Sequence, residues 1–369
     1  MFGKISKKFL KSSAPLLLKS GLFFALIIGG VLVLAQPKGL SGARVDLIVV
    51  DGGINPAVDD FIRESIARAH AGGAKALIIQ LDTPGGLLTS TRTIVKEILG
   101  APVPVMVYVA PSGAGAGSAG VFITMAGHIA AMAPGTNIGA AHPVAGGGQE
   151  VKGVMGEKIE NFTASFSEAI AQKRGRNTEF AIQAVRRSIS ITEKDALEKN
   201  VIDIVAKDIN DLLRQAEGKK VDVDGRQLTL SFKDVRVERF EMGLKQKIIN
   251  TLSDPTIAYL LLMAGILGLY MEFSHPGVIF PGVAGAIALL LALTSFQLIP
   301  FNYAGLLLIL LGIALLVGEA FVPSFGILGI GGAVSLGLGS LLLFDVEGSD
   351  LTVDRSTVFT TVFTLSALM

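Results

Sequence analysis

The chain has 369 residues, of which 63 are charged and 50% are hydrophobic, with a net charge of +1 and a mean hydropathy of +0.59. These values exclude a disordered chain, a nucleic-acid binder that works through bulk positive charge, and a wholly water-soluble protein. The chain has no cysteine, which excludes disulfides, a cysteine nucleophile and thiolate metal sites. Its four histidines are not spaced as metal ligands, so a zinc enzyme is not expected.

Residues 1–36 have the features of a secretory signal peptide or a retained N-terminal anchor. Five lysines precede the apolar residues 21–35, and the first acidic residue is Asp46. Because such a basic end stays in the cytoplasm, we expect the chain that follows to lie on the extracytoplasmic side of the cell membrane.

Residues 44–254 predict an α/β domain, because short apolar runs alternate with amphipathic stretches as in repeated βαβ units. Strands are expected at residues 45–50, 76–81, 103–109 and 201–205, and helices at 56–70, 87–99, 157–173 and 178–187. Thr192 and Asp195 resemble a capping box, and residues 221–232 predict a hairpin that turns at Asp224 and Gly225. This order predicts a mostly parallel sheet.

Residues 255–344 predict a four-helix transmembrane region. Its apolar stretches are 256–271, 278–298, 303–318 and 325–344, and apart from His275 the only side chains that ionise at neutral pH are Glu272 and Glu319. A shift of 47 residues places Gly265 on Gly312 and Glu272 on Glu319, with six further identities, which predicts two copies of one helical hairpin. Residues 345–369 are interpreted as a polar linker and the start of a further helix that looks truncated.

The two membrane glutamates allow a functional and a structural interpretation. Carboxylates in membrane helices are costly and often functional. Both Glu272 and Glu319 precede a proline corner, however, so we favour a role in capping the loop at the water interface. With a cytoplasmic N-terminus, both corners would face the cytoplasm.

Two glycine-rich elements of the α/β domain could carry chemistry. Residues 82–87 follow a strand and precede a helix, so their backbone N–H groups could form an anion hole, or simply an ordinary turn. Residues 111–120 place Ser118 at the head of the next helix, where it could be a nucleophile or a helix N-cap.

A serine nucleophile needs a base. His128 and His142 lack a convincing acidic partner in the sequence, although His142 stays open as a candidate. A lysine must be desolvated to titrate near neutral pH. Lys158 fits this better than Lys152, because helical spacing places Phe162 and Phe166 near its face.

Together these elements resemble a known family. The turn at residues 82–86, the serine in residues 117–120, residues 139–143, and Lys158 about forty residues after Ser118 resemble the NfeD family of membrane-bound serine proteases. That family is related to the Clp protease subunit and to signal peptide peptidase A. The order and spacing of the motifs carry the resemblance, which covers essentially the whole chain.

The resemblance implies a Clp/crotonase-type α/β fold followed by an α-helical transmembrane bundle. It implies Ser118 as nucleophile, Lys158 as general base, and the N–H groups of Gly86 and Leu87, with Ala119, as the oxyanion hole. No metal, nucleotide or other cofactor is required. A stomatin-like (SPFH) membrane protein is the implied partner, and self-association is expected by analogy. Longer members carry a C-terminal OB-fold domain, and the sequence printed here stops before one.

The sequence therefore predicts a membrane-bound, ATP-independent serine endopeptidase that cuts membrane-associated or exported polypeptides, stomatin-like partners among them. The alternative is a non-proteolytic scaffold that assembles with stomatin-like proteins. A crotonase-type hydratase is disfavoured by export and by the membrane region. A transporter would rest on the repeated hairpins alone.

Overall fold

The computed structural model describes residues 43–143, 153–275, 277, 279–299, 301–322, 325–344, 353 and 355–368. The predicted signal peptide or anchor at residues 1–36 lies outside these residues, as do Lys152 and most of the predicted polar linker.

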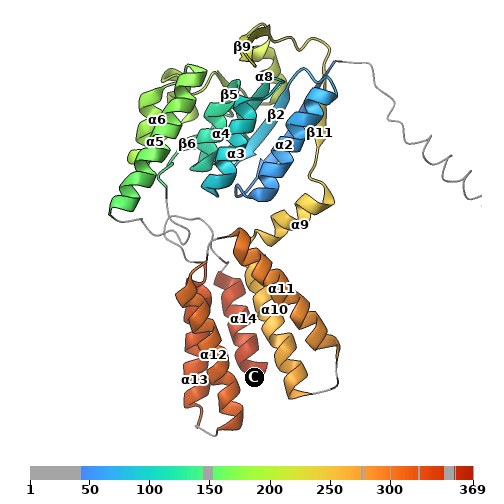
Figure 1. The fold of residues 1–369 in the computed structure, drawn as a ribbon, viewed down its shortest axis with the longest axis vertical. Coiled ribbons are helices and arrows are strands. Elements are labelled where there is room, and N and C mark those ends of the chain that lie inside the picture. The colour runs from blue at the N-terminus through green and yellow to red at the C-terminus, as the bar shows by residue number, and fades with distance from the viewer. Residues whose placement is uncertain are drawn as a thin grey trace, which may run out of the picture. The chain divides into compact units, whose positions relative to one another are not determined.

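The α/β domain is built on a parallel sheet of order β11-β1-β2-β3-β5-β8 (Figure 1). Each strand pairs in parallel with its neighbours, as the alternation of strands and helices predicts. The strands are β1 (Arg44–Asp51), β2 (Leu77–Asp82), β3 (Val105–Val109), β5 (Ile129–Met132), β8 (Ile204–Val205) and β11 (Arg236–Phe240). The α/β prediction with a mostly parallel sheet is confirmed.

Alternate side chains of the strands enter two separate cores. Ile48, Ile79 and Val107 point into the larger core, whereas Leu47 and Ile78, one residue away, point into the smaller one on the other face. Strands buried on both faces explain why the sequence shows continuous apolar runs rather than alternation.

Helices cover both faces of this sheet. They are α2 (Pro56–Ala71), α3 (Leu88–Leu99), α4 (Ala119–Ala126), α5 (Val154–Arg174), α6 (Thr178–Arg186), α7 (Glu193–Glu198) and α8 (Ile209–Ala216). Helix α9 (Leu244–Leu252) packs against α2 instead. Side chains of α2 to α6 enter the larger core and those of α8 enter the smaller one. The hairpin β9 (Lys220–Val223) and β10 (Arg226–Thr229) turns where predicted.

The predicted elements differ from the observed ones in a few places. The strand expected at 201–205 is shorter, because Val201 and Ile202 instead turn back onto Ala196 through backbone hydrogen bonds. Thr192 caps α7 by accepting from the Asp195 N–H, but the Asp195 side chain bonds the Thr192 hydroxyl and not its backbone, so the capping box is incomplete. Strands β5 and β11 were not predicted.

A small second sheet stands next to the end of the large one. It consists of β4 (Gly115–Gly117), β6 (Asn137–Gly139) and β7 (Ser190–Thr192), with β4 and β6 parallel and β7 antiparallel. Thr83, just past β2, pairs with Ala116 of β4 and so joins the two sheets.

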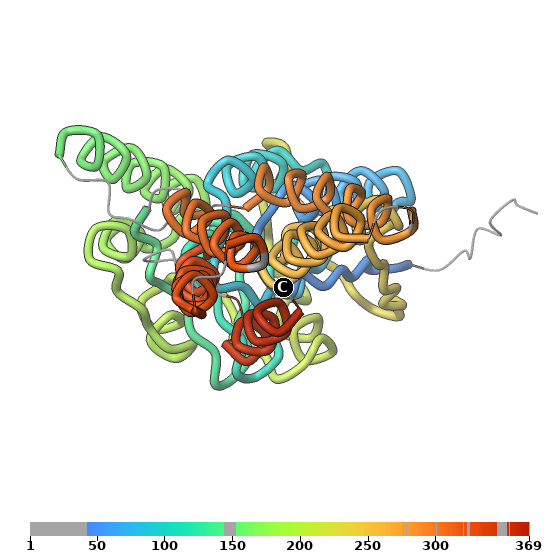
Figure 2. Tube along the Cα trace, turned by 90° about the horizontal axis from the view of Figure 1, so that it is seen from below, coloured from blue at the N-terminus to red at the C-terminus, as the bar shows by residue number. Residues whose placement is uncertain are grey.

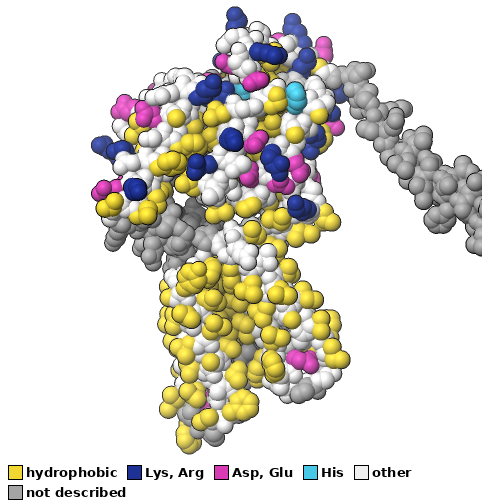
Figure 3. All heavy atoms as spheres, in the orientation of Figure 1, with side chains coloured by type: hydrophobic (Ala, Val, Ile, Leu, Met, Phe, Trp, Pro, Cys, Tyr) yellow, Lys and Arg dark blue, Asp and Glu magenta, His cyan; other side chains and the backbone are white. Residues whose placement is uncertain are grey.

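The C-terminal helices are α10 (Pro255–Ser274), α11 (Phe280–Leu298), α12 (Tyr303–Phe321), α13 (Ile327–Leu342) and α14 (Arg355–Leu368), seen along their axes in Figure 2. Among the described residues, α10 and α11 are long and apolar enough to cross a membrane, and α12 and α13 contain shorter apolar helices. Hydrophobic side chains dominate the visible surface of these helices, whereas charges are scattered over the α/β domain (Figure 3).

The sequence repeat reappears as a repeat of contacts. A methyl group on Gly265 would lie 2.5 Å from Leu289. The equivalent pair, 47 residues later in the chain, is Gly312 and Leu336, where the added methyl group would lie 2.6 Å from Leu336. These glycines therefore let α10 approach α11, and α12 approach α13, in the same way.

Glu319 serves as a cap at the corner between α12 and α13. Its two carboxylate oxygens accept the N–H groups of Gly326 and Gly329, at 2.9 and 3.1 Å, at the start of α13. The capping role predicted for Glu319 is confirmed. Its counterpart Glu272 lies against Gly282 in the first turn of α11.

Candidate active site

Ser118 lies on a strained turn between β4 and α4. Its backbone has φ 46° and ψ −107°, a conformation that residues other than glycine rarely adopt and that costs about 1–3 kcal/mol. The Ser118 N–H donates to the Gly139 carbonyl at 3.0 Å, which ties the turn to β6. A strained serine at a strand-to-helix turn is the geometry of a nucleophile elbow.

The side chain of Ser118 does not cap α4. It makes no capping hydrogen bond to the helix, and the residue is half-buried. Ser118 thus occupies the N-cap position of α4, but its hydroxyl makes no capping hydrogen bond and is not consumed by the helix that it precedes.

The two glycine-rich elements meet at this serine. A Cβ placed on Gly85 would lie 2.7 Å from the Ser118 Cβ and 3.2 Å from its Oγ, so only a glycine leaves room. Backbone bonds between Thr83 and both Gly115 and Gly117 hold the two segments in register, and the Asp82 carboxylate accepts the Gly115 N–H at 2.9 Å.

Three backbone N–H groups were predicted as oxyanion donors, and the prediction for Leu87 has to be corrected. Its N–H donates to the Ile54 carbonyl at 2.8 Å, because the turn pairs with Ile54 as a short parallel bridge. In this conformation the Leu87 N–H is not available to a substrate. The N–H of Ala119, in the first turn of α4, has no intrahelical partner, and Gly86 is exposed with φ 152°.

Lys158 lies exposed in the second turn of α5. The desolvation expected from its aromatic neighbours is not present: Phe166 stacks on Phe122 of α4 with ring centroids 5.7 Å apart, and Phe162 is half exposed beneath the Arg92 guanidinium. Among the residues that the structure describes, no hydrogen bond or ion pair joins Lys158 to Ser118.

Lys158 and Ser118 both lie toward the N-terminal ends of helices that pack against each other. Phe166 of α5 contacts Phe122 of α4, and the Arg174 Nε donates to the Ala126 carbonyl at 2.7 Å. Lys158 precedes Phe166 along α5, and Ser118 precedes Phe122 at the start of α4.

The two histidine alternatives differ in their surroundings. His128 is buried at the far end of α4, and burial, reinforced by the Arg174 charge, lowers its pKa to about 3. Its Nδ1 accepts the Val105 N–H, so it is a neutral structural residue. His142 is half-buried, and its Nδ1 lies 2.9 Å from the Val185 carbonyl, which orients the ring toward α6.

Two arginines that the sequence analysis missed hold the other end of α4. Arg174 donates to the Ala126 carbonyl, and Arg176 donates to the carbonyls of Met125 and Gly127 and pairs with Asp203 at 2.9 Å. Cations are favourable at a helix C-terminus. The paired basic residues just after a predicted helix were the available signal.

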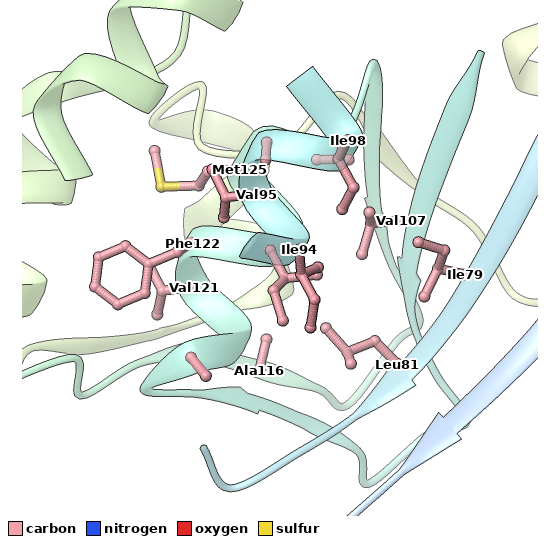
Figure 4. Close-up of a cluster of buried hydrophobic side chains, with 14 of the residues drawn as sticks. Ile79, Leu81, Ile94, Val95, Ile98, Val107, Ala116, Val121, Phe122 and Met125 are labelled. Carbon is pink, nitrogen blue, oxygen red and sulfur yellow. The ribbon is translucent and has the colours of Figure 1, made fainter. Parts of the chain in front are cut away.

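An apolar core packs against helix α4 (Figure 4). Val121 and Phe122 of α4 lie in one cluster with Ile94 and Ile98 of α3 and with Leu81 of β2. Ser118 is thus carried by a helix that is fixed by packing along its length and by guanidinium groups at its end. Among the described residues, no group of three or more metal-ligating side chains is assembled.

Comparisons with known proteins agree with this arrangement. Residues 44–240 match the N-terminal domain of NfeD1b, and residues 256–369 match the NfeD integral membrane domain. The chain is 37% identical over 317 residues to the membrane-bound protease PH1510 of Pyrococcus horikoshii, covering 85% of this chain and 72% of that one. It is 27% identical over 352 residues to the membrane protein NfeD1b of Bacillus subtilis, covering 95% and 76%.

Solved structures match the α/β domain. A lysine-to-alanine mutant of the 1510-N membrane-bound stomatin-specific protease, in complex with a substrate peptide, superposes with a TM-score of 0.53 at 35% identity, covering 58% of this chain and 99% of that one. The 1510-N membrane protease specific for a stomatin homolog from Pyrococcus horikoshii gives 0.51 at 34%, covering 58% and 100%. The α/β fold with a parallel sheet predicted for this domain is shared with these solved structures. The chain belongs to the NfeD family of membrane proteins and is homologous to a membrane-bound protease.

Proposed function

We propose that the protein is a membrane-bound serine endopeptidase in which Ser118 is the nucleophile and Lys158 the general base. The observation that carries the proposal is the conformation of Ser118. Its backbone is strained, its hydroxyl makes no capping hydrogen bond to α4, and its side chain lies against the glycine turn at Gly85. The related 1510-N protease has been studied as a serine-to-alanine and a lysine-to-alanine mutant, at positions 41 residues apart. Ser118 and Lys158 are 40 residues apart.

The reaction begins when neutral Lys158 removes the Ser118 proton as Oγ attacks a peptide carbonyl. The resulting oxyanion accepts hydrogen bonds from the N–H groups of Gly86 and Ala119, and the α4 dipole adds to its stabilisation. Lys158 then protonates the leaving amine as the C–N bond breaks. Water, deprotonated by the same lysine, then attacks the acyl-enzyme carbonyl. The bond between the carbonyl carbon and the Ser118 Oγ breaks, and Lys158 returns its proton to Oγ. These steps need no metal or nucleotide.

Lys158 has to lose water contact for this role. A lysine in solvent has a pKa of about 10.4, so only a small fraction is neutral at pH 7. Lys158 is exposed in this structure, so the proposal requires the start of α5 to be covered when substrate is bound. A bound polypeptide, or a second copy of the chain, would supply that cover.

The setting of the reaction follows from the membrane region and from the relatives. The basic residues before the apolar run at 21–35 support an extracytoplasmic position for the α/β domain, and we therefore expect exported or membrane-associated substrates. The related protease is described as specific for a stomatin homolog, and we extend a stomatin-like partner to this chain.

The decisive experiment compares full-length wild type with Ser118→Ala. Both are purified in detergent and incubated with an unfolded protein and with the C-terminal peptide of a stomatin-like protein, and the products are mapped by mass spectrometry. Ser112→Ala, an exposed serine of the same glycine-rich segment, is the matched control.

We expect cleavage by wild type and Ser112→Ala, and none by Ser118→Ala. Equal cleavage by all three would show that Ser118 is not the nucleophile. If none cleaves either substrate, the non-proteolytic scaffold replaces the protease.

A further inference from the structure

Helix α9 (Leu244–Leu252) has a polar face toward the α/β domain. Gln246 is buried, and its Nε2 donates to Glu64 at 3.0 Å. One turn later, the Asn250 Oδ1 accepts the Asn55 Nδ2 at 2.9 Å. The protein-facing side of α9 is therefore held by amide hydrogen bonds to α2.

The apolar side chains of α9 lie on the other side. Leu244 and Ile248, one turn apart, are 77% and 52% exposed. Lys245 and Lys247 stand on either side of this pair, and α9 has no acidic residue. A surface helix of a soluble protein has the opposite pattern, with its apolar stripe toward the core. A single exposed apolar side chain is ordinary. Leu244 and Ile248, however, lie together on the side of α9 opposite its docked polar face, which indicates that this side has a partner.

We propose that α9 is an interfacial helix that lies on the membrane surface, with Leu244 and Ile248 in the boundary between lipid headgroups and acyl chains. Helix α9 ends at Leu252, and the candidate span α10 begins at Pro255, so α9 directly precedes the membrane region in the chain. An apolar stripe flanked by lysines is the pattern of helices that lie in this boundary. Lys247 also pairs with Glu241 at 2.8 Å, and Lys245 is left to reach a lipid phosphate.

This placement connects the membrane to the glycine turn. Asn55, which α9 holds through Asn250, caps α2 by accepting the N–H groups of Ala57 and Val58. The preceding residue, Ile54, exchanges backbone hydrogen bonds with Gly85 and Leu87. Membrane contact at α9 thus sets the position of the turn next to Ser118. This last step rests on the proposed function, whereas the lipid contact itself does not.

The test uses the absence of cysteine from the chain. Full-length Leu244→Cys and Ile248→Cys are each labelled with an environment-sensitive bimane probe and reconstituted in phosphatidylcholine–phosphatidylglycerol vesicles. Asp224→Cys, in the exposed turn between β9 and β10, is the control. Quenching is measured with lipids brominated near the headgroup and with aqueous iodide. No step needs proteolytic activity, so failure of this inference and failure of the proposed function are distinguishable.

We expect brominated lipids to lower the fluorescence of both α9 probes at least two-fold and to leave the control unchanged, with the reverse order for iodide. Iodide quenching of the α9 probes equal to that of the control would overturn the proposal. Protection from both quenchers, together with a disulfide between chains when the unlabelled variants are oxidised, would overturn it in favour of an interface between two copies.

Discussion

The serine half and the lysine half of the proposed site are built in opposite ways. Ser118 is fixed by a positive φ, by a backbone bond to Gly139 and by the glycine turn at Gly85. Lys158 is an exposed side chain in the second turn of the long helix α5. In the proposed site the serine turn is therefore preorganised, whereas the lysine is not.

This difference has a chemical reason. Oxyanion stabilisation depends on backbone groups that do not reorganise during the reaction, so they have to be rigid from the start. A lysine base works only when it is neutral, which requires its removal from water. If Lys158 is the base, the proposed site becomes complete only when the start of α5 is covered.

The largest expected effect is that of Lys158→Ala, which removes the exposed lysine, the half of the proposed site that is not preorganised. We expect kcat to fall by about 10³-fold or more, because no other group then deprotonates Ser118. Lys158→Arg should be equally inactive, since a guanidinium stays protonated. Lys173→Ala, exposed on the same helix, is the control and should cleave the peptide at the wild-type rate. Full activity in Lys158→Ala would make His142 or Lys152 the base.

Gly85→Ala tests the rigid side. The new methyl group would press on Ser118 at 2.7 Å and would sit at φ 142°, so we expect kcat to fall by roughly 10²-fold and stability by about 1–3 kcal/mol. Gly113→Ala separates the two causes, because its φ is also positive, 92°, yet nothing lies within 4 Å of the added carbon. Equal loss of activity in both variants, measured by peptide cleavage and thermal melting, would assign the effect to backbone strain alone.

The same division explains what the sequence could predict. Buried strands and the helices between them can be predicted from apolar runs and from the glycines at their boundaries, as at β1, β2 and α2. The two glycine-rich elements were found because turns need particular residues at particular places. Strand β11 was missed because Arg236 to Phe240 is mostly polar and exposed at the sheet edge, where no periodicity marks a parallel partner 192 residues away.

The position of the base and the state of each donor could not be predicted in the same way. The pairing of Leu87 with Ile54 depends on a contact between distant segments, and the sequence pattern of a Gly-Gly turn is the same whether its N–H groups are free or bonded. The exposure of Lys158 depends on which elements pack beside the start of α5, which helical spacing alone does not give.

The variant His128→Gln tests the buried end of α4, the helix that carries Ser118. Burial and Arg174 lower the His128 pKa to about 3 in the folded protein, whereas an unfolded histidine titrates near pH ~6.5. The unfolded state therefore binds more protons between these values, and His128 lowers the free energy of unfolding by up to about 1.4 kcal/mol for each pH unit below ~6.5. We expect the His128→Gln variant to show a flatter fall of stability between about pH 6.5 and 4, measured by denaturant unfolding at several pH values. An unchanged slope would show that other groups cause the acid sensitivity.

The smallest expected effect is that of Asn250→Ala, which loosens the rigid half through α9. The variant removes the acceptor of the Asn55 side chain but leaves the Asn55 cap on α2, so we expect kcat to fall only a few-fold in vesicles. Amide hydrogen exchange at residues 83–88 should rise, because Ile54 no longer holds the turn as firmly. Thr251→Ala, whose hydroxyl bonds only within α9, is the control. Because exchange is measured without substrate, a rise in exchange with unchanged kcat would separate loosening of the turn from its use in catalysis.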